Sequence, residues 1–465
     1  MNIKKGIVYI FVANAISLLA SLFAGFVLPK LLSIETYSDI KLFQLYVTYL
    51  GILHLGYSDG MYLRHGGRTI DVVNKKEINA EFKTFKIFQF MISVIAVLVA
   101  IALQNKILLL CALVIVPVNS GNYLRNLYQA TGEFKKYSRL TNISTLLIFA
   151  INVILLFIIK SNNPIVFIVA YVVAYYIYWL FLEIENIKIF GRESDKPDKK
   201  FLISDIKTGI FLMTGNFCNV IFTSIDRLFV ERLMGKIEFA IYSFAVGIEN
   251  LVSVFINPIS TVLYNYFCNN NGVERVKRIK RAVFLFGALL LAFVYPARFI
   301  VVHWLTNYVS SISIIMFLFA AQFASIMVRC VHINLYKSQK KQNRYFFIMV
   351  AIVLLSIVLD ALAYYLFGSM EAIAIATLIT NVVWFIVGEV DLRKYALGIR
   401  EYLYYLAIII TFLITIAIES VILGMVVYLI VLMVATVLLL PDSFKFAIEE
   451  ISKLKKKVFK KRNEE

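Results

Sequence analysis

The run FFIMVAIVLLSIVLDALAYYLF, residues 346–367, contains a single charged side chain, Asp360. A helix rises about 1.5 Å per residue, so as a helix this run is long enough to cross a hydrocarbon layer roughly 30 Å thick. In a water-soluble domain, a helix of this length would carry polar residues along the face that meets water. The stretch therefore predicts a transmembrane helix.

Runs of the same kind recur along the whole chain. Of 465 residues, 61% are hydrophobic and 16% are charged, and the mean hydropathy is +0.81. A soluble domain is nearer half apolar and a quarter charged. The sequence predicts an all-α polytopic membrane protein of about fourteen transmembrane helices, each needing about 20 apolar residues. The expected spans are 7–29, 40–62, 85–104, 107–130, 140–160, 164–182, 207–230, 237–265, 282–303, 311–335, 346–367, 371–389, 403–419 and 421–440.

Basic residues are distributed unequally between the two sides that this topology defines. If the N-terminus is placed inside, 39 of the 47 Lys and Arg residues belong to the groups on the inner side, at the inner ends of spans or in the loops and tails between them. An excess of Lys and Arg marks the cytoplasmic side of membrane proteins. We therefore expect both termini in the cytoplasm. The net charge of +18 then follows from loops that face lipid headgroups, and nucleic acid is not an expected partner.

The longest hydrophilic stretch, Glu183–Ser204, divides the chain after the sixth span. Short patterns on either side resemble each other: Asn126-Leu127-Tyr128 precedes a basic turn, as does Asn334-Leu335-Tyr336. Six spans are an even number, so a second copy would have the same orientation, with a cleft between the two lobes. We expect two six-helix lobes in a pseudo-two-fold arrangement, at 1–190 and 191–395. A helix hairpin with a basic cytoplasmic tail, at 396–465, would follow.

Two predicted spans carry polar stripes of matching 3-4-3 spacing, which places each set on one helical face. A cavity that accepts an anionic headgroup would explain both stripes, with Arg125 and Arg329 as contacts for the anion. Polar packing between helices, with arginines that extend to the membrane surface, would explain them as well. The residues concerned are Asn119, Asn122, Asn126 and Gln129 in the fourth span, and Gln322, Ser325, Arg329 and His332 in the tenth.

Carboxylates inside the spans are the second group of candidates. Glu249, with Ser253 and Asn257 continuing its helical face, and Asp360 could each bind a coupling proton or Na⁺. Each could equally neutralise a basic residue.

Acids and bases near the span ends are candidates for gates or ion pairs. Asp226 and Arg227 are adjacent at the outer end of the seventh span. Asp59 has Arg64 within reach in the sequence, and a local ion pair is the first expectation.

The sequence contains no motif for catalysis or for a resident cofactor. No G-x-S-x-G, H-E-x-x-H or C-x-x-C pattern occurs, and His54, His303 and His332 lack metal-ligand spacing. No long external loop is available to build a catalytic site. We therefore expect no enzyme, metal or cofactor.

Four longer segments resemble the Wzx-type polysaccharide flippases of the multidrug/oligosaccharidyl-lipid/polysaccharide exporter superfamily. They are NAISLLASLFAGFVLPKLLSIETYSDIKLF (14–43), LHLGYSDGMYLRHGG (53–67), NYLRNLYQATGEFKKYS (122–138) and SIDRLFVERLMGKIEFAIYSFAVGI (224–248). The resemblance implies a bacterial cytoplasmic membrane protein that moves an undecaprenyl-diphosphate-linked oligosaccharide across the bilayer by alternating access. Such a flippase serves the biosynthesis of O-antigen, capsule or exopolysaccharide. A polysaccharide polymerase and a chain-length regulator are the implied protein partners.

Two other interpretations stay open. A multidrug or cation exporter of the same superfamily would need acids in its cleft, whereas arginines are at least as prominent inside these spans. A membrane polysaccharide polymerase would need a catalytic loop or intramembrane motif that the sequence lacks.

Overall fold

A computed structural model describes residues 16–441, apart from 67, 69, 71–72, 192, 194–198 and 270–271. All regular elements in these residues are helical, which confirms the predicted all-α class. The start of the first predicted span, most of the charged segment GRESDKPDKK and the basic tail after residue 441 lie outside the described residues.

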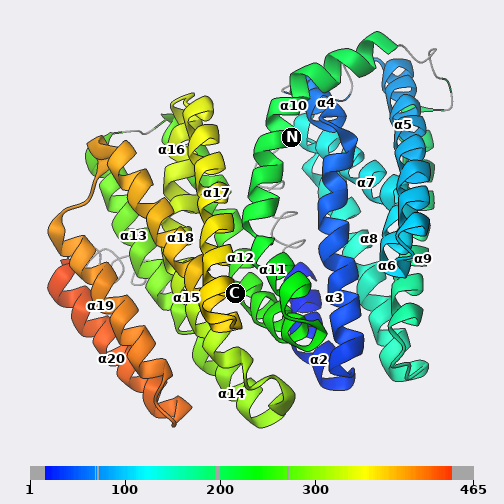
Figure 1. The fold of residues 1–465 in the computed structure, drawn as a ribbon. Helices are drawn as coiled ribbons and strands as arrows, with labels where there is room; N and C mark the ends of the chain where they lie inside the picture. The colour runs from blue at the N-terminus through cyan, green and yellow to red at the C-terminus, as the bar shows by residue number, and fades with distance from the viewer. Residues whose placement is uncertain are drawn as a thin grey trace, which may run out of the picture. The chain divides into compact units, whose positions relative to one another are not determined.

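The chain forms two compact units, residues 1–243 and 244–465. The boundary between them falls within helix α12 (Lys236–Asn269), and the helices of each unit are labelled in Figure 1. The other elements of the first unit are η1 (Phe23–Val27), α2 (Leu28–Leu31), α3 (Ile34–Tyr49), η2 (Leu50–His54), α4 (Tyr57–His65), α5 (Lys75–Ala102), α6 (Lys106–Leu113), α7 (Ile115–Ala130), α8 (Phe134–Val153), η3 (Ile154–Ile158), α9 (Pro164–Phe190), α10 (Lys199–Phe222) and α11 (Ile225–Leu233).

The second unit ends in a pair of helices that pack against each other, α19 and α20, drawn in orange and red in Figure 1. The elements of this unit after α12 are α13 (Val273–Leu291), α14 (Val294–Trp304), η4 (Thr306–Tyr308), α15 (Ser311–Met327), η5 (Val328–His332), α16 (Ile333–Ser338), α17 (Gln342–Phe367), α18 (Met370–Asp391), η6 (Arg393–Tyr395), α19 (Ile399–Ile416) and α20 (Val421–Leu439).

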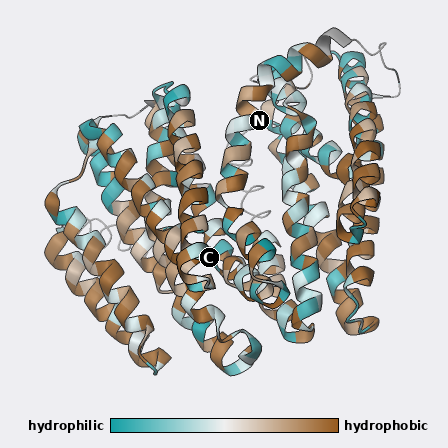
Figure 2. Cartoon of the chain, viewed as in Figure 1, coloured by the Kyte–Doolittle hydropathy of each residue, from teal (hydrophilic) through white to brown (hydrophobic). Residues whose placement is uncertain are grey.

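Ten helices among the described residues are long and apolar enough to cross a membrane, and two bent pairs raise this number to twelve. The pairs are α6–α7, bent by 42°, and α10–α11, bent by 52°. The segment Ile16–Leu31 is a shorter apolar helix. The predicted second span is broken between α3 and α4, where Leu55 and Gly56 have φ angles of 48° and 86°. The protein is thus a multi-pass membrane protein, with apolar residues along most of its helices (Figure 2), and the structure is consistent with fourteen spans.

Close packing of α10 on α4 explains why the first compact unit extends past the predicted lobe boundary at residue 190. Gly56 and Gly60 on α4 and Gly209 on α10 let the two backbones approach closely, as small residues do in membrane helices. A Cβ atom on Gly209 would collide with the backbone at Gly56 and Gly60. By contact, α10 therefore belongs to the first unit. The lobe boundaries drawn from the sequence repeat stay a prediction.

Replacing Gly209 by Ala should destabilise the protein by about 1–3 kcal/mol, because the added methyl group meets fixed backbone atoms. Gly247→Ala in α12 is a matched control, since a Cβ atom there has no neighbour within 4 Å. It should be neutral or stabilising, because Ala favours helix over Gly by up to about 1 kcal/mol. Thermal unfolding of the detergent-solubilised protein measures both variants. Equal effects of the two substitutions would contradict the proposed crossing.

Three polar contacts occur in both units at corresponding helices. Asn126 donates to the Ser58 hydroxyl at 3.0 Å, and Asn334 donates to the Ser260 hydroxyl at 3.0 Å. The other matched contacts are ion pairs: Lys86–Glu183 with Lys280–Glu389, and Arg139–Glu185 with Arg344–Asp391. The acids lie two residues apart near the end of α9 and again near the end of α18. Such recurring contacts are what the predicted internal repeat would produce, and the repeat itself stays a prediction.

Candidate functional site

Arg329 lies in the π-helical turn η5 and contacts α12 through neutral groups. Its Nη1 donates to the Ser253 hydroxyl at 3.1 Å, and its Nη2 donates to Asn257 Oδ1 at 2.9 Å. A π-helical turn leaves carbonyl groups without the usual helical partner. Here the carbonyl oxygen of Arg329 accepts from the Ser260 hydroxyl at 2.8 Å. The turn and α12 therefore hold the half-buried arginine in place without an acid.

Arg125 in α7 has similar surroundings in the first unit. Its Nη2 donates to Asn122 Oδ1 at 2.6 Å, and Asn122 in turn donates to Asn119 Oδ1 at 3.4 Å. Like Arg329, it is half-buried. Its guanidinium therefore contacts a neutral amide.

Arg125 and Arg329 differ from the arginines that stabilise the bundles. Arg64, Arg139, Arg281 and Arg344 form ion pairs with acids. Within the described part of its own unit, neither Arg125 nor Arg329 has an acid at ion-pair distance. Both therefore keep a positive charge that an anion could neutralise.

The two polar stripes divide into interior residues and residues near an arginine. Asn119 is fully buried, and its amide donates to Gln89 Oε1 and to the carbonyl oxygen of Leu50. Asn126 and Ser325 also lie in the interior or at its edge, whereas Gln129 is exposed and Gln322 is half-buried. Asn122, Ser253 and Asn257 contact the arginines. Asn119 and Asn126 therefore contact neighbouring elements of the first unit.

His332 is a correction to the expected cavity lining. Its side chain is 1% exposed, and Nε2 lies 2.7 Å from Glu389 Oε1. The π-helical turn changes the angle between successive side chains. His332 therefore points into the bundle, whereas Arg329 stays half-buried and points in a different direction.

Asp360 and Glu249 are placed in α17 and α12. Asp360 is fully buried, and the Ser356 hydroxyl lies 3.5 Å from its Oδ2. Glu249 is half-buried. Among the described residues, no three His, Cys, Asp or Glu side chains lie together in a geometry that could hold a metal ion.

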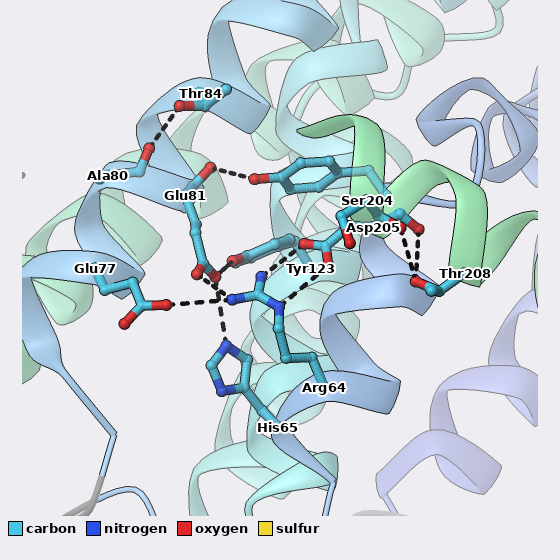
Figure 3. A network of polar contacts seen from close by, with 11 residues as sticks. Arg64, His65, Glu77, Ala80, Glu81, Thr84, Tyr123, Ser204, Asp205 and Thr208 are labelled. Atoms are coloured by element: carbon cyan, nitrogen blue, oxygen red, sulfur yellow. Dashed lines mark hydrogen bonds and ion pairs between the residues drawn. The ribbon is translucent and has the colours of Figure 1, made fainter. Parts of the chain in front are cut away.

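The expected ion pair between Asp59 and Arg64 is wrong. Residues five apart on a helix point in different directions, and Asp59 contacts His54 at 3.5 Å and Asn216 at 3.3 Å. Arg64 turns instead toward Glu81 of α5 and Asp205 of α10, with Glu77 at 3.4 Å (Figure 3). This Arg64 cluster joins three helices of the first unit.

The side chains of Asp226 and Arg227 also fail to pair, since adjacent residues on a helix diverge. Asp226 is buried and accepts from the Tyr242 hydroxyl at 2.9 Å and from the Arg227 backbone N–H at 2.7 Å. The guanidinium of Arg227 donates to the carbonyl oxygen of Thr223. Asp226 thus fixes the junction of α11 and α12.

The Arg64 cluster should contribute strongly to stability. Burial opposes the charge of Arg64, but hydrogen bonds to Glu81 and Asp205 hold its pKa above the ordinary value. Arg64→Gln leaves two nearly buried carboxylates uncompensated and should cost about 3–5 kcal/mol. Arg139→Gln is the matched control: Arg139 is 58% exposed, so its loss should cost less than about 1 kcal/mol. Thermal unfolding compares the two, and a small loss for Arg64→Gln would refute the role of the cluster.

Four charged residues in these networks are not among the residues that the sequence predicts for a site: Glu81, Asp205, Lys280 and Glu389. The predicted spans begin at 85 and 282, which places Glu81 and Lys280 in loops. In the structure α5 begins at Lys75 and α13 at Val273. Val276, Lys280 and Val283 are four and three residues apart, which places them on one face of α13. This spacing is the signal that could have placed Lys280 in the protein interior.

Comparison with known proteins agrees with this architecture. Residues 84–271 match the model of a family described as polysaccharide biosynthesis protein. The lipid II flippase MurJ, in an inward closed conformation, has a similar fold. Its TM-score is 0.67 at 12% sequence identity, over 94% of this chain and 99% of MurJ. No match was found among curated proteins by sequence.

Transporters of the MOP superfamily share the fold as well. For an inward-facing multidrug resistance MATE family transporter, the TM-score is 0.54 at 15% identity, over 83% of this chain and 94% of that one. For a MOP superfamily transporter from Pyrococcus furiosus, it is 0.53 at 12% identity, over 84% and 96%. The fold of this chain is therefore the one that MurJ and the MATE transporters share.

Proposed function

We propose that the protein is a flippase for undecaprenyl-diphosphate-linked oligosaccharides in surface polysaccharide biosynthesis. It would carry its substrate from the inner to the outer leaflet of a bacterial cytoplasmic membrane, with both of its own termini in the cytoplasm. Arg125 in the first unit and Arg329 in the second are the candidate contacts for the diphosphate, and the lipid tail stays in the bilayer. A polysaccharide polymerase and a chain-length regulator would act on the exported glycan. The match to a polysaccharide biosynthesis family over residues 84–271 supports this class of substrate.

The observation that carries the proposal is that neither arginine has an acid at ion-pair distance among the described residues of its own unit. Charged side chains inside membrane spans are costly and usually face a partner or a cavity. Arg329 is held by a hydroxyl and an amide at 3.1 and 2.9 Å. These groups orient the guanidinium but leave its charge in place. A diphosphate supplies the missing negative charge and the bidentate geometry that arginine favours.

The rival function is a multidrug exporter, because MATE transporters share the fold. A site for cationic drugs needs unneutralised acids, and the polar residues beside Arg125 and Arg329 are neutral. The solved Pyrococcus furiosus transporter is described as having a binding pocket of reverse polarity. The fold is thus compatible with pockets of different charge, and side chains decide the substrate.

Native mass spectrometry of the full-length protein can separate these two functions. We expect undecaprenyl diphosphate to bind more tightly than undecaprenol by at least about tenfold, the effect of one charge-assisted hydrogen bond of about 1.5 kcal/mol. Tetraphenylphosphonium, a cationic amphiphile, should not compete. Competition by this cation, or equal binding of the two polyprenyl compounds, would favour an exporter and contradict the flippase.

A further inference from the structure

A buried cluster of charged groups lies inside the second unit, beside the turn that carries Arg329. Glu389 of α18 accepts from Lys280 Nζ at 2.6 Å and from the Tyr402 hydroxyl at 2.8 Å, and its Oε1 lies 2.7 Å from His332 Nε2. Lys280 is 0% exposed and His332 is 1% exposed. One carboxylate therefore contacts a lysine and a histidine at the same time.

The corresponding position in the first unit shows what is unusual about this cluster. There the side chains of the matched pair, Lys86 and Glu183, are each 23% exposed, and the pair contains no histidine. When the Asn-Leu-Tyr patterns of the two units are aligned, His332 corresponds to Leu124, which is fully buried in the first unit. At this position the first unit therefore has an ion pair without a titratable ring, whereas the second unit has His332.

The geometry fixes where a proton would go. A neutral His332 donates from Nε2 to Glu389, which leaves Nδ1 as the atom with a free lone pair. Nδ1 is buried without a hydrogen-bond partner among the described residues. It lies against Gly388, where a Cβ atom would collide with it. The ring also stacks on Phe385, with a centroid distance of 5.9 Å.

Protonation at Nδ1 would place two cations on one carboxylate. The charged and titratable groups around His332 are Lys280 from α13, Glu389 from α18, Tyr402 from α19, Lys337 at the end of α16 and Arg329 on its own turn. Helix α15 carries no acid or base. An additional buried positive charge is costly where only one acid is present, so the arrangement around η5 must change when His332 is protonated.

We propose that His332 is a proton-binding site that controls the position of Arg329 through the π-helical turn they share. In the neutral state, Glu389 holds His332 and the turn presents Arg329 to Ser253 and Asn257. In the protonated state, the repulsion from Lys280 loosens the turn and moves the guanidinium. The link to substrate rests on the proposed role of Arg329 in binding a diphosphate, whereas the proton site does not.

Two measurements on the full-length protein in lipid nanodiscs test this site. The first is NMR of the four histidines, labelled with ¹³C, in which His332 is assigned by its disappearance in His332→Asn. Lys280→Met removes the competing cation, so His332 should stay protonated to a pH higher by about 1–3 units. Lys86→Met, the matched change in the first unit, should leave this midpoint unchanged. A His332 that stays neutral in both wild type and Lys280→Met would overturn the proposal.

The second measurement is hydrogen exchange of the segment 328–338. At low pH, the backbone amides of this segment should exchange about tenfold faster in the wild type than in His332→Asn at the same pH. A tenfold difference corresponds to a coupling free energy equal to a shift of one pKa unit. At high pH the two should agree. Equal exchange at both pH values would leave His332 as a packing residue and refute the switch. Neither readout requires transport, so a failed flippase assay would not affect the outcome.

Discussion

Arg329→Ala should abolish export of the surface polysaccharide while the protein remains inserted and folded. The guanidinium is the only charged group that η5 directs at Ser253 and Asn257. A charge-assisted hydrogen bond contributes about 1.5–3 kcal/mol. Loss of that contact should weaken binding of undecaprenyl diphosphate by about 10- to 150-fold. Arg329→Lys should retain more activity, because the charge stays while the two-pronged geometry is lost.

Arg344→Ala is the matched control in the same unit. Its side chain is 63% exposed and pairs with Asp391, so its removal should change export little. Surface polysaccharide is measured in cells that carry the complete biosynthetic locus, and binding is measured by native mass spectrometry. Normal export and binding by Arg329→Ala would remove this residue from the substrate site.

The membrane fold could be predicted from the sequence because it depends on composition over long windows. Each span needs about 20 apolar residues, and a run such as residues 346–367 has one dominant physical solution. The Asn-Leu-Tyr pattern could also be recognised in the sequence, and its asparagine contacts a serine in each unit. These features depend on local sequence or on periodicity.

The partners of the charged residues could not be predicted. Arg64 has an acid, Asp59, five positions away, yet it pairs with Asp205, 141 positions away. Which acid faces a given arginine depends on how helices cross, and Gly56, Gly60 and Gly209 set that crossing. The π-helical turn at Val328–His332 has a similar effect. It turns His332 inward, although ideal helical spacing places it on the face of Arg329.

Asp360→Asn should strongly reduce export and remove its dependence on a coupling cation. Asp360 is a fully buried acid in the candidate span Asn343–Phe367, and a buried carboxylate inside a membrane helix usually has a functional role. Asn keeps the size of the side chain but cannot carry the negative charge that holds a proton or Na⁺. Ser356→Ala is the control, since it removes only a hydroxyl 3.5 Å from Oδ2. Glu249→Gln tests the second acid in the same way.

The assay that separates binding from coupling is export by the protein reconstituted in liposomes, with imposed gradients of pH or Na⁺. For Asp360→Asn, we expect undecaprenyl diphosphate to bind as it does to the wild type, because Arg125 and Arg329 are unchanged. The export rate under a gradient should fall by at least about tenfold, which corresponds to an activation free energy higher by about 1.4 kcal/mol. A rate that responds to both gradients as the wild type does would exclude Asp360. If Glu249→Gln alone then lost the response, the coupling cation would bind at α12 rather than at α17.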